Sequence, residues 1–179
     1  MFSVIAVLLW CRLGCITVVV CPLTALGRQN VRYLQARGIS AASLSAETSP
    51  QVRCAVFDCL RRRALAVLVV SPEQLAVNLG LCGALDRRGV DLLVVDEAHT
   101  WLSWPGWRPS MTAAAARFPT AQRLALTATL QRADEPRLLQ VLAMPGSRVV
   151  RHPFFRDSLA LHVEQRPPVL SWTSESSPL

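Results

Sequence analysis

Short, uninterrupted apolar runs recur along this chain, and each gives way to residues that begin a turn or a helix. Residues 16–21 (ITVVVC), 64–70 (ALAVLVV) and 92–95 (LLVV) carry no charged side chain and are rich in β-branched residues. Such runs are typical of strands buried on both faces of a parallel sheet. Strands of this kind are covered by helices through right-handed βαβ units. The predicted fold class is therefore α/β, with helices on both faces of a mostly parallel sheet.

Signals for helix ends lie between these runs. Serine followed by proline, at 49–50 and again at 71–72, predicts an N-cap and the first residue of a helix. The first of these helices should continue to about residue 63, and Gln74 predicts a capping box for the second. The other predicted elements are a helix ending at Gly38, a helix over 110–117, a strand over 123–126, a helix over 134–142 and a strand over 148–150.

The charge of the chain is carried by arginine alone. All 19 basic residues are Arg, and against 12 carboxylates they give a net charge of +7. The absence of lysine excludes Schiff-base chemistry and a phosphate-binding lysine supplied by this chain. The basic surplus points to a polyanion such as nucleic acid, or to an anionic membrane. Alternatively, it reflects only a GC-rich coding sequence that uses Arg in place of Lys.

The six cysteines do not form a metal or disulfide pattern. None is arranged as C-x-x-C, so no zinc or redox framework is predicted. Free thiols in a reducing compartment fit their apolar surroundings better.

The first 26 residues raise the question of a membrane or targeting segment, because they contain one charge, Arg12. The first apolar run covers only residues 1–11 and no basic stretch precedes it. A membrane-spanning helix needs about 20 apolar residues, so a buried helix or strand is the favoured interpretation. A membrane-anchored domain stays open as an alternative.

Two adjacent carboxylates, Asp96 and Glu97, directly follow the strand predicted over 92–95, and His99 comes two residues later. Ligands of open α/β sheets bind outside the carboxyl ends of the strands. Asp96 could hold Mg²⁺ directly or through water, and Glu97 could orient the water that attacks a γ-phosphate. The alternative is a pair of solvated carboxylates at a strand end.

A tryptophan-rich stretch follows these acidic residues. Trp104, Trp107 and Arg108 surround a Pro-Gly turn, where indoles could stack on unpaired bases and the guanidinium could pair with phosphate. Packing against the sheet is the alternative, and it is preferred for Trp101.

Several segments, in order, resemble the motifs of RecQ-type superfamily 2 DNA helicases. Residues 95–99 (VDEAH) and the aromatic stretch ending in 107–109 (WRP) resemble motif II and the aromatic-rich loop of that family. Residues 19–26 resemble motif Ia, 69–75 motif Ib, 124–129 motif III, and 153–156 the segment that leaves the first RecA-like domain. The resemblance covers roughly residues 18–156, and four ordered motifs are far more specific than one.

The resemblance implies the fold, the function and the site. The fold would be RecA-like, a P-loop NTPase fold, and the chain would be part of an ATP-dependent 3′–5′ DNA helicase. ATP and Mg²⁺ would be its cofactors, single-stranded DNA its preferred partner, and the nucleus or another DNA-containing compartment of the cell its location. The implied residues are Asp96, Glu97 and His99 for catalysis, Pro22, Leu23, Ser71, Pro72, Trp104, Trp107 and Arg108 for nucleic acid, and Thr127 and Thr129 for coupling. N-capping of the next helix is the alternative role of the two threonines.

The chain also departs from that family. No G-x-x-x-x-G-K-[ST] segment occurs in the 179 residues, so ATP binding by this chain alone should be weak. We expect a remnant helix over 1–15, a partial RecA-like domain over 16–156 and a linker or disordered tail over 157–179, with the adenine-contacting segment and the second RecA-like domain missing. The chain would be a fragment of an active helicase or a degenerate module that only binds nucleic acid. Whether it is an enzyme by itself stays open.

Overall fold

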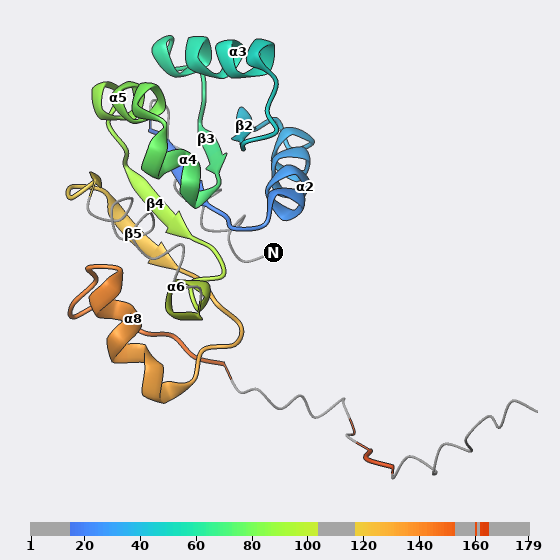
Figure 1. The fold of residues 1–179 in the computed structure, drawn as a ribbon, viewed down its shortest axis with the longest axis vertical. Helices are drawn as coiled ribbons and strands as arrows, with labels where there is room; N and C mark the ends of the chain where they lie inside the picture. The colour runs from blue at the N-terminus through green and yellow to red at the C-terminus, as the bar shows by residue number, and fades with distance from the viewer. Residues whose placement is uncertain (1–14, 104–116, 153–159, 161, 165–179) are drawn as a thin grey trace, which may run out of the picture. The chain divides into compact units, whose positions relative to one another are not determined.

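The computed structural model describes residues 15–103, 117–152, 160 and 162–164 (Figure 1). The chain divides into two compact units, Met1–Ser147 and Arg148–Leu179. All helices and strands of the described residues belong to the first unit. None of these helices combines the length and the apolar character needed to cross a bilayer.

Within the described residues, five parallel strands form one sheet, in the order β2-β3-β1-β4-β5. The strands are β1 (Thr17–Val20), β2 (Ala41–Leu44), β3 (Val67–Val70), β4 (Leu92–Val95) and β5 (Gln122–Ala125). Every residue of β1, β3 and β4 is buried. The apolar runs of the sequence thus form the three central strands of the sheet, where the side chains on both faces are buried.

Helices cover both faces, because alternate strand residues point to opposite sides. On one face, α2 (Thr24–Gln35) packs Val31 and Leu34 near Val19 and Val69. The helices of the other face share a core cluster with strand residues such as Val18. They are α3 (Pro50–Arg61), α4 (Pro72–Val77), α5 (Leu79–Arg88), α6 (Thr100–Ser103) and α8 (Glu135–Val141). The predicted α/β class, with helices on both faces, is confirmed.

The two Ser-Pro helix starts differ. At α3, Ser49 Oγ accepts a hydrogen bond from the Val52 backbone N–H at 3.4 Å. At α4, the Ser71 side chain makes no such bond, so the predicted capping box is wrong. Gln74 is buried instead, and its Oε1 accepts from Arg53 Nη1 of α3 at 3.0 Å. A hydrogen bond between α3 and α4 has thus taken the place of the predicted capping bond within α4.

Strand β2 was not predicted from the sequence. Its residues, Ala-Ala-Ser-Leu, lack the β-branched pattern of the inner strands, and only Ala41 and Leu44 are buried. Pairing with β3 makes it a strand, since Ala41 to Leu44 align in register with Val67 to Val70.

The strand predicted over 148–150 is wrong, since these residues have no regular structure. Val149 and Val150 are exposed, and no neighbouring strand pairs with them among the described residues. The helix predicted over 110–117 lies outside the described residues except for Arg117, as does most of the tail predicted over 157–179 and of the remnant helix over 1–15.

The packing of the sheet predicts different effects on stability for two leucine substitutions. Leu93 of β4 is fully buried, whereas Leu79 at the start of α5 is 77% exposed. We expect Leu93→Ala to lower the free energy of unfolding by about 2–5 kcal/mol, because it leaves a cavity. Leu79→Ala should change it by no more than about 0.5 kcal/mol. Urea denaturation followed by circular dichroism measures both, and similar losses would contradict the burial of β4.

Candidate functional site

The carboxyl ends of the five strands lie along one edge of the sheet, because all strands are parallel. Asp96 and Glu97 directly follow β4 at this edge. The Asp96 N–H donates to the Val20 carbonyl of β1 at 3.0 Å, and the Ala98 N–H donates to the Leu126 carbonyl beyond β5 at 2.9 Å. The acidic segment is therefore held between the last residue of β1 and the first residue after β5.

Local hydrogen bonds orient the two carboxylates, both of which are half-buried. The Glu97 N–H donates to Asp96 Oδ1 at 3.1 Å. Glu97 itself has a φ of 49°, in the left-handed region that non-glycine residues occupy at a cost of about 1–3 kcal/mol. The Thr100 hydroxyl donates to the Glu97 carbonyl at 2.8 Å and helps to hold this turn. Strained backbone of this kind is concentrated at functional sites.

His99 connects the acidic segment to the segment after β5. Its Nδ1 lies 2.9 Å from Thr127 Oγ1 and 3.4 Å from Glu97 Oε2. One ring nitrogen thus faces two oxygen atoms from different parts of the chain. The Thr129 backbone N–H donates to Thr127 Oγ1 at 3.4 Å. Of the two predicted coupling residues, Thr127 is the one whose side chain reaches His99.

The alternative role of these threonines was N-capping of the next helix. That helix is a short 3₁₀ turn, η1 (Arg132–Asp134), and its N-cap residue is Gln131. The N-capping interpretation of Thr127 and Thr129 is therefore wrong.

The acidic pair fits a magnesium ion only in part. Asp96 is half-buried and directly follows β4 at the carboxyl edge of the sheet, where a carboxylate can hold Mg²⁺ through water. No cluster of three or more His, Cys, Asp or Glu side chains able to hold a metal occurs within the described ranges. An ion here would need phosphate oxygens as further ligands, which is usual for Mg²⁺. The chain contains no lysine to neutralise that phosphate.

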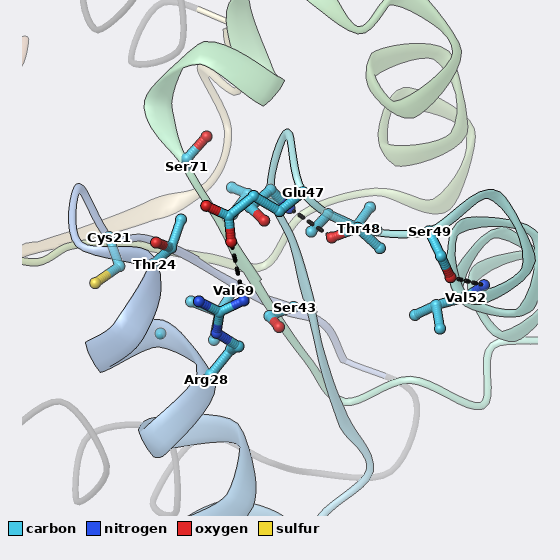
Figure 2. A pocket seen from close by; sticks show the side chains of 14 residues that line it. Cys21, Thr24, Arg28, Ser43, Glu47, Thr48, Ser49, Val52, Val69 and Ser71 are labelled. Carbon is cyan, nitrogen blue, oxygen red and sulfur yellow. Dashed lines mark hydrogen bonds and ion pairs between the residues drawn. The ribbon is translucent and has the colours of Figure 1, made fainter.

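A pocket of about 200 Å³ lies at the same edge, beyond β1, β2 and β3 (Figure 2). Residues that carry a hydroxyl make up much of its lining. They are Thr24, Ser43, Ser45, Thr48, Ser49 and Ser71. Arg28 of α2 also lines it, and its Nη1 pairs with Glu47 Oε2 at 3.1 Å, as Figure 2 shows. Both side chains of this ion pair are more than half exposed, so the pair contributes little to stability and can open.

Close packing brings the arginine to this pocket. A Cβ built on Gly27 would lie 3.1 Å from Val69 Cγ1, so glycine lets α2 approach β3 closely. Arg28 is the next residue of α2, so this close approach places it at the pocket. On the other side, Thr48 Oγ1 accepts from the Ser45 N–H at 2.9 Å and keeps the loop after β2 compact.

Cys21 lines this pocket, and its thiol has low reactivity. Its thiol donates to the Leu23 carbonyl at 3.4 Å. Burial raises the pKa of the thiol to about 11, against the opposing effect of that hydrogen bond, and the charges of Asp96 and Glu97 raise it further. The group stays protonated at neutral pH and is a poor nucleophile.

The predicted nucleic-acid residues differ in their placement. Ser71 lines the pocket, and Leu23 is exposed. Pro22 and Pro72 are buried, and each directly follows a lining residue of the pocket, Cys21 or Ser71. Trp104, Trp107 and Arg108 lie outside the described residues. Trp101 is fully buried, which confirms its packing role.

The sequence interpretation missed Arg28, Glu47 and most of the hydroxyls of the pocket. The signal that could have found them is the hydroxyl-rich stretch 43–49 (SLSAETS), which directly follows the start of β2. Because β2 was not predicted, this stretch could not be assigned to the carboxyl edge.

Relatives of the chain are helicases. ATP-dependent DNA helicase RecQ of Haemophilus influenzae is 30% identical over 155 residues, which cover 84% of this chain and 25% of that protein. ATP-dependent DNA helicase Q1 of Rattus norvegicus is 27% identical over 161 residues, covering 84% and 26%. The chain thus spans about a quarter of the length of these relatives. The resemblance to RecQ-type helicases is confirmed.

Solved helicase structures share the fold. The structure of Mycobacterium smegmatis helicase Lhr bound to ssDNA and AMP-PNP matches with a TM-score of 0.56 and 25% identity, over 74% of this chain and 20% of that one. A hypothetical ATP-dependent RNA helicase from Sulfolobus tokodaii matches with a TM-score of 0.60 and 20% identity, over 80% and 41%. These matches confirm the predicted RecA-like class.

The family comparison covers most of the sequence. DEAD/DEAH box helicase is the family that matches, over residues 1–136 of the 179. This range contains the acidic pair, His99, Thr127 and the hydroxyl-lined pocket. The chain belongs to the DEAD/DEAH box helicase family.

Proposed function

We propose that this chain, over residues 16–156, forms part of the first RecA-like domain of a RecQ-like, ATP-dependent 3′–5′ DNA helicase. The observation that carries the proposal is the arrangement of one sheet edge, where the Asp96–Glu97 pair and the pocket with Arg28 stand side by side along neighbouring strand ends. The direction of unwinding and the second RecA-like domain follow from the resemblance to the RecQ family.

The acidic pair would serve ATP hydrolysis. Bound Mg²⁺ would supply positive charge against the β- and γ-phosphate oxygens of ATP. Asp96 would hold the ion through water, with its carboxylate oriented by the Glu97 N–H. Glu97 would orient the attacking water. His99 would couple changes at this site to Thr127, because the two side chains are in contact at 2.9 Å.

The hydroxyl-lined pocket would bind the DNA backbone. Hydroxyls and one guanidinium suit phosphodiester oxygens, and such contacts carry no base specificity. The Lhr structure, whose fold is similar, contains both ssDNA and AMP-PNP. Ser71, Pro72, Pro22 and Leu23 would belong to this surface, and Trp104, Trp107 and Arg108 would add stacking on unpaired bases. Work on DNA would place the protein in the nucleus or another DNA-containing compartment.

A second candidate function is nucleic-acid binding without ATP hydrolysis. The observation that favours it is the absence of lysine from all 179 residues. Without that charge, this chain alone has little means of holding the triphosphate.

ATP hydrolysis by the purified chain tests the catalytic part. We expect no DNA-stimulated phosphate release from Mg²⁺-ATP, because the chain supplies no lysine to the β- and γ-phosphates. Release is measured with and without single-stranded DNA. DNA-stimulated hydrolysis that disappears in Glu97→Gln would contradict the proposal that the chain is only part of the catalytic domain.

The pocket predicts opposite effects for the two members of its ion pair. Arg28→Ala should weaken binding of a single-stranded oligonucleotide by about tenfold or more, since a hydrogen bond to a charged group contributes about 1.5–3 kcal/mol. Glu47→Gln should strengthen binding, because it removes a carboxylate that competes with phosphate for Arg28. Arg32→Ala is the matched control, an exposed arginine one turn along the same helix. Fluorescence anisotropy measures all three, and equal losses in the two arginine variants would argue against the pocket.

The tryptophans generate a separate prediction. Trp104→Ala or Trp107→Ala should weaken single-strand binding about tenfold, because removing one stacking aromatic costs about 1–3 kcal/mol. Arg148→Ala should matter less, since an exposed charge elsewhere contributes only to a screened field. The same titration over a range of salt concentrations measures these variants. Equal effects in all three variants would indicate that the two tryptophans pack within the protein and do not stack on bases.

A further inference from the structure

Four arginine side chains line a hollow of about 220 Å³ between α3 and α5. These are Arg61, Arg63, Arg87 and Arg88, and the other lining residues that the structure describes are Leu60 and Ala84. The two helices pack against each other on one face of the sheet (Figure 1). Because helices of βαβ units run opposite to the strands, their carboxyl ends lie at the amino edge of the sheet, away from Asp96. We call this site the arginine hollow.

The acidic side chains of this region already have partners. Asp58 pairs with Arg61. Asp86 pairs with Arg117 at 2.8 Å, and Asp91 Oδ2 accepts from the Ile16 N–H at 2.7 Å. No carboxylate lines the hollow among the residues described. The lining of the hollow therefore holds four arginines and no described carboxylate, although Arg61 already pairs with Asp58.

Arg63 occupies a backbone position that suits glycine. Its φ is 56°, and it follows Arg62, the C-cap of α3. The Arg63 N–H donates to the Leu60 carbonyl at 3.2 Å, and the next N–H, of Ala64, donates to the Cys59 carbonyl at 2.9 Å. Helices often end with such a left-handed residue, usually glycine, because a side chain is strained there. In this chain the strained position is occupied by Arg63, which lines the hollow.

Arg88 lies deepest in the cluster, with 8% of its surface exposed. Burial lowers the pKa of its guanidinium, and the charge of Arg63 lowers it further, while Asp91 opposes both. A cation that is buried beside other cations is stabilised when an anion binds among them.

Compensation of helix dipoles explains only part of this arrangement. Arg61, Arg87 and Arg88 lie in the last turns of α3 and α5, where positive charge is favourable. Arg63 lies beyond the helix end and still contributes to the same hollow. An anion bound in the hollow would account for the position of Arg63 beside Arg87.

We propose that the arginine hollow is a second anion site, which binds phosphate groups of a nucleic-acid backbone at the edge of the sheet opposite to the acidic pair. Guanidinium groups are suited to phosphate because their planar N–H donors match its oxygens in pairs. The choice of nucleic acid as the source of phosphate rests on the proposed function.

The test uses substitutions that separate binding from stability. Arg63→Gly removes one guanidinium and places the preferred residue at a φ of 56°, so the melting temperature should stay equal or rise. Binding of a labelled single-stranded oligonucleotide to this variant should weaken at least threefold, and to Arg63→Gly with Arg87→Ala about tenfold. Arg62→Ala is the matched control, because Arg62 is the adjacent residue, is exposed and is not among the residues of the hollow. It should stay within twofold of the unchanged chain.

Each result decides between explanations. An equal loss in Arg62→Ala, or no loss in the double variant, would overturn the arginine hollow as a site. If Arg28→Ala still weakens binding in that case, the proposed function stands without it. Competition identifies the ligand: polyglutamate of equal charge should displace the oligonucleotide poorly, and equal displacement would overturn phosphate as the ligand. Inorganic triphosphate that binds more tightly than the oligonucleotide, and loses this advantage in Arg63→Gly, would overturn nucleic acid as its source.

Discussion

The parallel pairing of β3, β1 and β4 is the constraint on which the rest of the structure depends. Val18 pairs in register with Leu68 and Leu93, and all three are fully buried. Such strands leave no side chain to solvent, so both faces must be covered by helices and function is confined to the two edges. The carboxyl edge holds the acidic pair and the hydroxyl-lined pocket. The amino edge holds the arginine hollow.

Rigid strand ends position the candidate site more than its own side chains do. Backbone hydrogen bonds attach each loop to a neighbouring strand, as Asp96 to Val20 and Ser71 to Leu44. The side-chain contacts above them are weaker and adjustable: the Arg28–Glu47 pair is exposed, and His99 Nδ1 faces two oxygens. A fixed backbone under adjustable side chains suits a site that must bind and release charged ligands.

Local sequence rules succeeded where the signal was strong and near in sequence. The inner strands and the N-cap at Ser49 formed as predicted, because burial and a bond to Val52 suffice for them. The capping box at Ser71 failed, because Gln74 found Arg53 of another helix. Strand β2 was missed because pairing with β3, and not its own composition, makes it extended.

The sequence by itself determined the α/β class, the buried inner strands and the acidic pair after β4, because these depend on hydrophobic pattern and on neighbours along the chain. It also determined, through the absence of lysine, which phosphate chemistry this chain does not supply. Only the tertiary structure decided that Arg28 meets the loop after β2, that His99 meets Thr127, and that Arg63 and Arg88 share one hollow. These residues are far apart in sequence, and no local pattern encodes which distant strand or helix ends become neighbours.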